Sequence, residues 1–165
     1  MAQPRKTKKV RPTEARLRLE VSVNEQRLRL RGGDNVLMTC VISTSKWGLG
    51  SEPGSNQTPL GRFRVKEKHG HGAPYGTIFK SRKPVGRWNP RGRVLPDDLI
   101  TSRIFWLDGL EKHNANTYER YIYFHGTNQE HLLGTPHSHG CIRLRNDDMI
   151  ELFDLVPEGT EVVIG

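Results

Sequence analysis

A cysteine flanked by histidine and glycine stands in the segment TPHSHGCIRLRN, which covers residues 135–146. A cysteine acts as a nucleophile when a base removes its proton, donors stabilise the developing oxyanion and a further group orients the base. Histidine is the side chain that most often serves as this base. Cys141 can therefore be a nucleophile, a metal ligand or a buried packing residue, and the surrounding sequence has to decide between them.

Two histidine–glycine pairs accompany this cysteine. His125 and Gly126 follow an aromatic run sixteen residues before Cys141, and His139 and Gly140 directly precede it. A glycine before the nucleophile lets the backbone approach a substrate carbonyl, so the amides of Gly140 and Cys141 could serve as oxyanion donors. Spacing alone does not show which histidine pairs with the thiol, because the contact is made through the fold.

The two other interpretations are weaker. A zinc site would draw on His125, His137, His139 and Cys141. Two of these histidines stand two apart beside glycine and proline, and there is no second cysteine pair, so no metal site is predicted. Scattered histidines around a buried thiol would be the ordinary case, but the combination of HGT and SHGC argues against it.

The segments that must position these groups are typical of short β-strands. Residues 15–30, ARLRLEVSVNEQRLRL, alternate apolar and polar side chains on both sides of a break at 24–26, which predicts a β-hairpin. The apolar run 35–43 predicts a central strand that buries Cys40. Further short strands are predicted at 62–65, 77–80, 103–107, 117–124 (ending at His125) and 160–164.

Loop residues dominate 43–61 and 81–98. A loop as long as the first is usually functional or disordered, and the arginines of the second could meet an anionic substrate or remain solvated. The pattern that follows RLRN at 143–146 predicts one helix, with Asn146 as N-cap and with Pro157 and Gly159 ending it. Seven to nine short strands with one helix near the C-terminus predict a mainly β domain, either a sandwich or a barrel.

Most of the net charge of +8 lies near the N-terminus. Up to Arg31 there are ten Lys and Arg against three Glu, which accounts for +7 and leaves the rest nearly neutral. We expect a flexible basic arm at 1–16 and a single folded domain at 17–165. A basic arm on a neutral body is weak evidence for nucleic-acid binding, so a solvated tail is favoured. No apolar run resembles a secretory signal or a membrane span, so a cytoplasmic location is expected, or a periplasmic one if a signal was removed.

The residues now assembled resemble the catalytic domain of the L,D-transpeptidase (YkuD) family. HGT at 125–127 and SHGCIRL at 138–144 look like the signature of that family. STSKWG and TPLGRFRV within 43–65 look like the family's upstream segment, and the ending DMIELFDLVPEGTEVVI is similar to the C-terminal part of its domain. The resemblance covers roughly 17–164 and implies a YkuD-like β-sandwich or barrel without a cofactor.

The resemblance also implies a role for each matching residue. Cys141 would be the nucleophile, and His125 the base that the carbonyl of Gly126 orients. His139 would shape the site, and Gly140 would supply oxyanion amides. The resemblance also implies substrate-binding roles for two further residues: Ser138, which more simply holds the turn, and Arg143, which would bind a substrate carboxylate or tie the catalytic loop down.

The reaction that the resemblance implies is cleavage of the bond between the third residue and D-alanine in peptidoglycan stem peptides. The thioacyl-enzyme would pass its acyl group to an amine, giving a 3→3 crosslink or D-amino-acid exchange, or to water. A carbapenem would be an inhibitor at Cys141. Alternatives are a carboxypeptidase that only hydrolyses recycled muropeptides in the cytosol, and a non-catalytic module that binds wall fragments or nucleic acid. The oligomeric state is not predicted.

Overall fold

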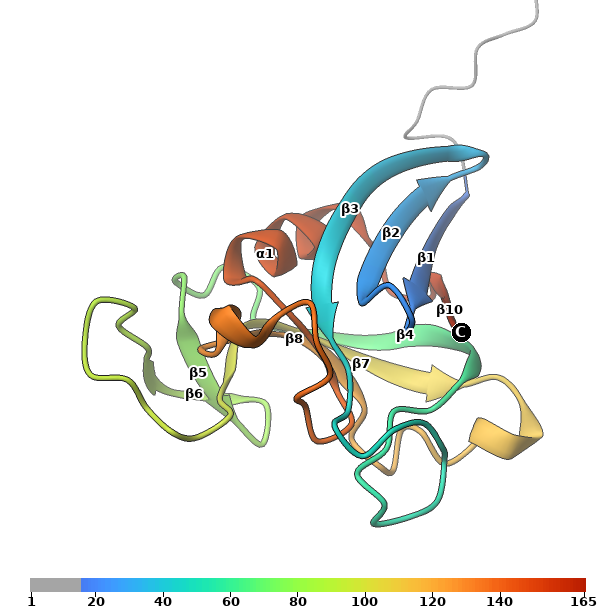
Figure 1. The fold of residues 1–165 in the computed structure, drawn as a ribbon. Coiled ribbons are helices and arrows are strands. Elements are labelled where there is room, and N and C mark those ends of the chain that lie inside the picture. Colours follow the sequence, from blue (N-terminus) through green and yellow to red (C-terminus); the bar gives the residue numbers. More distant parts are fainter. Residues whose placement is uncertain (1–15) are drawn as a thin grey trace, which may run out of the picture.

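The computed structural model describes residues 16–165, so the predicted basic arm lies outside the described residues except for Arg16. Over this range the chain forms ten strands and one α-helix, more strands than the seven to nine expected (Figure 1). The strands are β1 (Leu17–Ser22), β2 (Arg27–Gly32), β3 (Asn35–Ser43), β4 (Gly61–His69), β5 (Thr77–Lys80), β6 (Lys83–Arg87), β7 (Ile100–Gly109), β8 (Tyr123–Thr127), β9 (Ile142–Leu144) and β10 (Glu161–Ile164). The helix is α1 (Asn146–Leu155), and two short 3-10 turns are η1 (Lys112–Asn114) and η2 (Glu130–Leu132).

The strands form one sheet that closes on itself. Their order is β4-β10-β1-β2-β3-β9-β8-β7-β5-β6, and β4 also pairs with β7. This extra pairing closes the sheet into a barrel and leaves the β5–β6 hairpin attached to one end of β7. Most neighbours are antiparallel, but β1 with β10 and β8 with β9 are parallel. The predicted mainly β class is confirmed, and barrel closure removes most of the exposed sheet edges.

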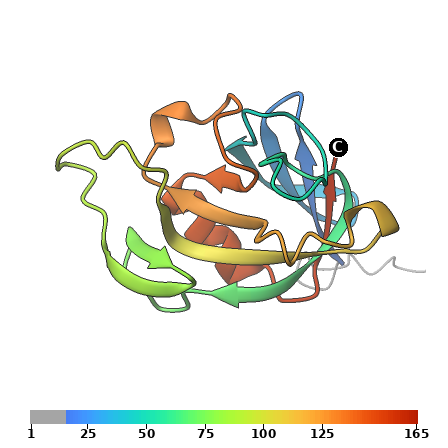
Figure 2. The same ribbon diagram turned by 90° about the horizontal axis from the view of Figure 1, so that it is seen from below.

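The hydrophobic core lies between the barrel wall and α1. In Figure 1 the helix lies on the same side of β7 and β8 as the β1–β3 wall, and Figure 2 shows the β5–β6 hairpin projecting from this body. Alternation along the strands sends every second side chain inward, such as Leu19 and Val21 from β1 and Phe105 and Leu107 from β7. The helix completes this core with its buried apolar residues, Met149, Leu152 and Phe153.

Several predicted elements agree with the structure, and two do not. The hairpin β1–β2 and the strand 35–43 form as expected, and Cys40 is buried. The predicted loop 81–98 contains β6, which pairs with β5. The predicted strand 117–124 is mostly a turn, and β8 begins only at Tyr123. Tyr118 and Tyr121 of this turn pack on Trp106 although neither lies in a strand. The aromatic run therefore reflects packing on Trp106 and not an extended backbone.

Asn146 does not cap the helix, which corrects the predicted role. It is the first residue of α1, and its side chain is buried. Its Oδ1 accepts hydrogen bonds from the hydroxyls of Thr101 and Ser102, each at 2.6 Å, and its Nδ2 donates to the carbonyl of Thr127 at 2.8 Å. Glu130 caps the helix instead, because its carboxylate accepts from the Asn146 N–H at 2.9 Å. One amide thus joins α1, β7 and β8.

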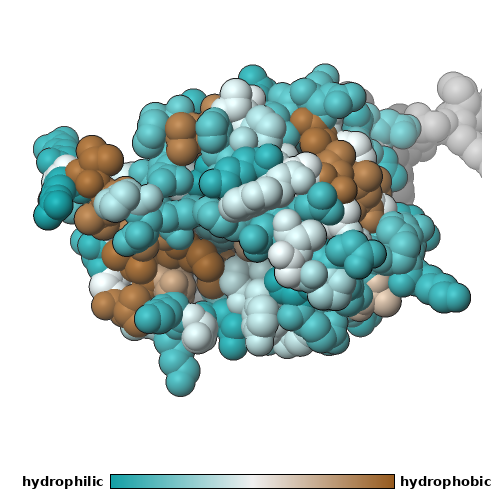
Figure 3. Space-filling view, turned by 60° about the horizontal axis from the view of Figure 1, so that its bottom comes forward, coloured by the Kyte–Doolittle hydropathy of each residue, from teal (hydrophilic) through white to brown (hydrophobic). Residues whose placement is uncertain are grey.

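The surface of the described part of the chain is mainly polar. Figure 3 shows one face that is largely hydrophilic, with hydrophobic residues gathered in separate patches. Within residues 16–165, no helix has the length and apolar character needed to cross a membrane.

Gly126 provides a test of the β7–β8 packing. A Cβ at this position would lie 2.6 Å from the carbonyl oxygen of Thr101 and 2.7 Å from Oδ1 of Asn146. Gly126→Ala is therefore expected to lower the free energy of unfolding by about 2 kcal/mol or more, since the backbone of β7 has to move. Urea denaturation measures this change.

Gly86→Ala in β6 is the matched control. Its added Cβ meets only the Ile78 side chain, at 3.9 Å, so stability should stay within about 1 kcal/mol of the parent. Equal stabilities for the two variants would contradict this account of the β7–β8 contact.

Candidate active site

Cys141 lies immediately before β9, beside β8. The parallel register pairs His125 with Arg143 and Phe124 with Ile142, which brings the two halves of the motif together. The Tyr123 N–H donates to the Cys141 sulfur at 3.4 Å, and the thiol donates to the carbonyl of Tyr121 at 3.4 Å. Burial raises the pKa of the Cys141 thiol to about 11, although the Tyr123 amide opposes this shift.

His125 is held in one orientation and one tautomer. Its side chain is buried, and its Nδ1 lies 2.6 Å from the carbonyl oxygen of Gly126. A carbonyl oxygen only accepts, so Nδ1 carries the proton and Nε2 keeps its lone pair. Burial lowers the pKa of His125, which keeps the imidazole neutral at pH 7. A neutral imidazole with a free ring nitrogen is the form that a general base needs.

These two residues share one pocket. The cavity has a volume of roughly 380 Å³ and is lined by Asp97, Asp98, Ile100, His125, His139 and Cys141. The structure therefore brings three of the predicted catalytic side chains to one surface. It adds two carboxylates from the segment that the sequence pattern assigned only to a basic loop.

The SHG turn, residues 138–140, supports Cys141 through hydrogen bonds to the backbone. The Ser138 hydroxyl is buried, donates to the Cys141 carbonyl at 2.6 Å and accepts from the Gly140 N–H at 3.2 Å. Gly140 has φ +122°, a backbone conformation that side chains disfavour, and its carbonyl accepts from Thr58 at 3.0 Å. Ser138 thus stabilises the turn, and its hydroxyl faces backbone groups rather than the pocket.

The oxyanion donors differ from the expected pair. The Gly140 amide is already bonded to Ser138, whereas the Cys141 amide has no acceptor among residues 16–165. The Cys141 N–H is therefore the free donor that this conformation could offer to an oxyanion formed at its sulfur.

The long loop 43–61 is ordered and forms part of the site. Ser45 pairs with Ser138 as an isolated bridge, and the Ser45 N–H donates to Thr58 at 3.0 Å. Arg120 braces the same loop by donating to the carbonyl of Gln57 at 2.8 Å. These contacts support the turn that carries Cys141.

Arg143 is completely buried, so its guanidinium does not reach a substrate in this conformation. It donates to Asp98 at 3.0 Å, to Gln129 at 2.6 Å and to Ser43 at 3.2 Å. The other oxygen of Asp98 lies 3.6 Å from Nδ1 of His139. Of the two roles predicted for Arg143, the structure shows the tie that holds the catalytic loop.

Sequence reasoning missed Asp98 and Trp47. His139 is exposed on one side and packs on Trp47, with ring centroids 4.8 Å apart. His137 points to solvent and does not line the pocket. Among the described residues, no cluster of three or more His, Cys, Asp or Glu could hold a metal ion. Asp98 had no local signal, because its partners are distant in the chain.

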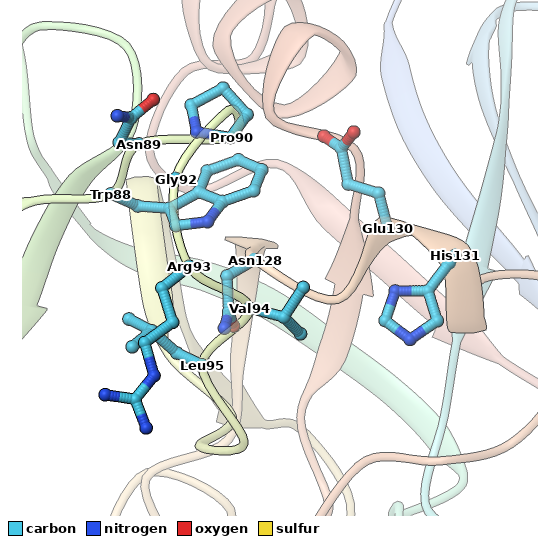
Figure 4. A pocket seen from close by; sticks show the side chains of 10 residues that line it. All are labelled: Trp88, Asn89, Pro90, Gly92, Arg93, Val94, Leu95, Asn128, Glu130 and His131. Atoms are coloured by element: carbon cyan, nitrogen blue, oxygen red, sulfur yellow. The ribbon is translucent and has the colours of Figure 1, made fainter.

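A second, larger pocket lies beside the site. Its volume is roughly 450 Å³, and Figure 4 shows the 88–95 loop with Trp88 on one side of it and Glu130 and His131 of η2 on the other. Asn128 also lines this pocket, and its Nδ2 donates to the carbonyl of Asp97 at 2.9 Å. This pocket has no cysteine, whereas Cys141 and His125 line the smaller one.

Comparison with known proteins agrees with this geometry. The model of the YkuD family, described as the L,D-transpeptidase catalytic domain, matches residues 16–164. The chain is 30% identical over 146 residues to the putative L,D-transpeptidase YkuD of Bacillus subtilis, covering 88% of this chain and 64% of that protein. It is 38% identical over 107 residues to YqjB of the same organism, covering 65% of this chain and 51% of that protein.

Solved structures show the same fold. An L,D-transpeptidase from Mycobacterium smegmatis has a TM-score of 0.60 at 17% identity, with 92% of this chain and 59% of that chain covered. The L,D-transpeptidase LdtMt1 in complex with imipenem has a TM-score of 0.58 at 20% identity, with the same coverage of both chains. The chain spans between half and two thirds of the length of the relatives and structures named here. Since the family model matches nearly every described residue, the chain belongs to the YkuD family of L,D-transpeptidase catalytic domains.

Proposed function

We propose that the chain is a cysteine acyltransferase that cleaves the bond between the third residue and D-alanine in peptidoglycan stem peptides. One observation carries this proposal: Cys141 and a neutral His125 line the same pocket, and the Nδ1–H of His125 donates to the carbonyl of Gly126. Family membership supplies the substrate class, because the related proteins are named L,D-transpeptidases.

The proposed reaction begins with a neutral thiol. Because the pKa of Cys141 is about 11 and that of His125 is lowered, the resting pair is thiol and imidazole rather than thiolate and imidazolium. As the sulfur attacks the peptide carbonyl, its proton passes to Nε2 of His125, and the Cys141 N–H stabilises the oxyanion. The C–N bond then breaks, the proton moves to the departing D-alanine amine, and a thioester remains on Cys141.

The second half of the reaction regenerates the enzyme. An acceptor amine or a water molecule attacks the thioester while His125 takes a proton from it, and the thiolate leaves and is reprotonated. An amine gives a 3→3 crosslink or an exchanged D-amino acid, whereas water gives a tripeptide. Both outcomes use the same residues, so the acceptor distinguishes a transferase from a carboxypeptidase.

The product assay tests the proposal directly. A muropeptide with a tetrapeptide stem is incubated with the enzyme, with and without a D-amino acid, and the products are analysed by mass spectrometry. Loss of D-alanine with incorporation of the D-amino acid supports transfer, and loss alone supports hydrolysis. An unchanged tetrapeptide under both conditions would refute the proposed function.

Cys141→Ala is expected to lower this turnover at least about a thousandfold, because the covalent route is lost. Incubation with imipenem should add a single drug mass to the parent and none to this variant. Cys40→Ala is the matched control, since Cys40 is buried in the core away from the pocket and should leave both readouts unchanged. Turnover by Cys141→Ala at the parental rate would exclude this nucleophile.

The reactivity of the free thiol should report its raised pKa. In the Cys40→Ala background, the alkylation rate of Cys141 by iodoacetamide is expected to keep rising with pH toward about 11, because only the thiolate reacts. Quenched mass spectrometry gives this rate from pH 6 upward. A plateau reached by about pH 8 would instead mean that a thiolate–imidazolium pair forms without substrate.

A further inference from the structure

A wall of aromatic side chains lies directly beside Cys141. Trp106 of β7 and Tyr123 of β8 form a cross-strand pair, and the next pair along the same face is Ile104 with His125. Because strands rise about 3.3 Å per residue, the aromatic pair lies roughly 7 Å from the pair that holds the proposed base. Cys141 packs against the cluster that contains both Trp106 and Tyr123.

Arg82 lies over this wall. Its guanidinium is 4.4 Å from the centroid of the Trp106 ring, and its NH1 donates to the Tyr123 hydroxyl at 3.0 Å. It comes from the two-residue turn between β5 and β6, where Ser81 has φ +49° and Arg82 has φ +63°. Such a turn normally uses Asn-Gly, so a serine and an arginine are held there at a conformational cost.

The charge of Arg82 is unpaired. Among residues 16–165, none of the ion pairs involves Arg82. Glu67, which also approaches the aromatic wall, accepts from the Tyr118 hydroxyl and lies 3.4 Å from His69. A guanidinium has five N–H donors, and the protein uses only one of those on Arg82.

This arrangement contrasts with that of Arg143. Arg143 is buried and bonded to Asp98, Gln129 and Ser43, whereas Arg82 is partly exposed at the edge of the site. A planar guanidinium with free donors, stacked on an aromatic ring, is suited to binding a carboxylate. The exposed Tyr121 ring, 5.7 Å from the same guanidinium, extends an apolar surface on which an aliphatic chain can lie.

We infer that Arg82 binds a carboxylate of the donor stem peptide while the scissile carbonyl lies at Cys141. This inference rests on the proposed function and adds the group that selects an anionic donor. Two carboxylates of a donor stem are candidates, the α-carboxylate of the terminal D-alanine and, where the third residue carries one, its side-chain carboxylate. Both present the same chemistry to Arg82, and the experiment separates them.

The test compares three tetrapeptides with each enzyme. One carries both carboxylates, one has the side-chain carboxylate amidated, and one has an amidated C-terminus. Turnover is measured with the parent, Arg82→Gln, Arg82→Lys and Lys83→Gln, and binding is measured by calorimetry in the Cys141→Ala background. Lys83 is the exposed neighbour in the same hairpin, so Lys83→Gln removes the same charge without touching the wall.

Arg82→Gln is expected to raise KM for the unmodified tetrapeptide by roughly 10- to 100-fold and to weaken its binding equally, with kcat nearly unchanged. Arg82→Lys should recover part of the affinity, and Lys83→Gln should match the parent. One amidated tetrapeptide should bind weakly to the parent, and Arg82→Gln should not weaken its binding further. The carboxylate that is amidated in this tetrapeptide is the one that Arg82 binds. Melting temperatures check that each variant folds.

Two results would overturn the inference. One is an equal effect of Arg82→Gln on all three tetrapeptides, because a general structural role would cause it. The other is parental turnover and binding by Arg82→Gln. Either result leaves cleavage by the parent intact and therefore the proposed function standing. Failure of the parent to cleave or bind any tetrapeptide would remove both the function and the inference.

Discussion

A fully buried guanidinium needs a carboxylate, and this requirement organises the site. Placing Arg143 in the interior costs several kcal/mol unless the charge is paired and hydrogen-bonded. Asp98 supplies the pair at 3.0 Å, and this contact ties the segment before β7 to β9. The other oxygen of the Asp98 carboxylate lies 3.6 Å from Nδ1 of His139. The register of β9 on β8 places Arg143 opposite His125. One ion pair thus holds the loop, the turn and the strand that carry the chemistry.

Closure of the barrel provides the second constraint. The β8–β9 pair is parallel within a largely antiparallel sheet, so the chain has to leave β8 and return from the other end. That return passes through η2 and the SHG turn, and it puts Cys141 at the same end as His125. The Asn146 side chain then joins α1 to both β7 and β8. A histidine and a cysteine sixteen residues apart line one pocket because the topology brings their strands together.

The sequence revealed the residues whose local pattern is strong. Alternation identified the β1–β2 hairpin, and the HGT and SHGC segments identified His125 and Cys141. Residues whose roles depend on distant partners were missed: Asp98 sits in a loop of ordinary composition, and its partner Arg143 follows 45 positions later. Asn146 matched a helix cap by position, but its side chain satisfies buried hydroxyls on β7. Local patterns report periodicity and turn chemistry, whereas pairing across a closed barrel depends on the register.

Electrostatics divide the arginines near the site into two kinds. Arg143 is neutralised by the protein and shapes the fold, whereas Arg82 keeps most of its donors free. The protein cations do not turn Cys141 into a thiolate, since burial outweighs the nearby Arg120 and Arg143 and the pKa of the thiol remains about 11. The thiol and the imidazole are both neutral, so neither of them contributes a positive charge that could attract an anionic peptide. In the proposed reaction, the cation at the aromatic wall attracts the substrate, and charges separate only when the sulfur attacks and the Cys141 amide stabilises the oxyanion.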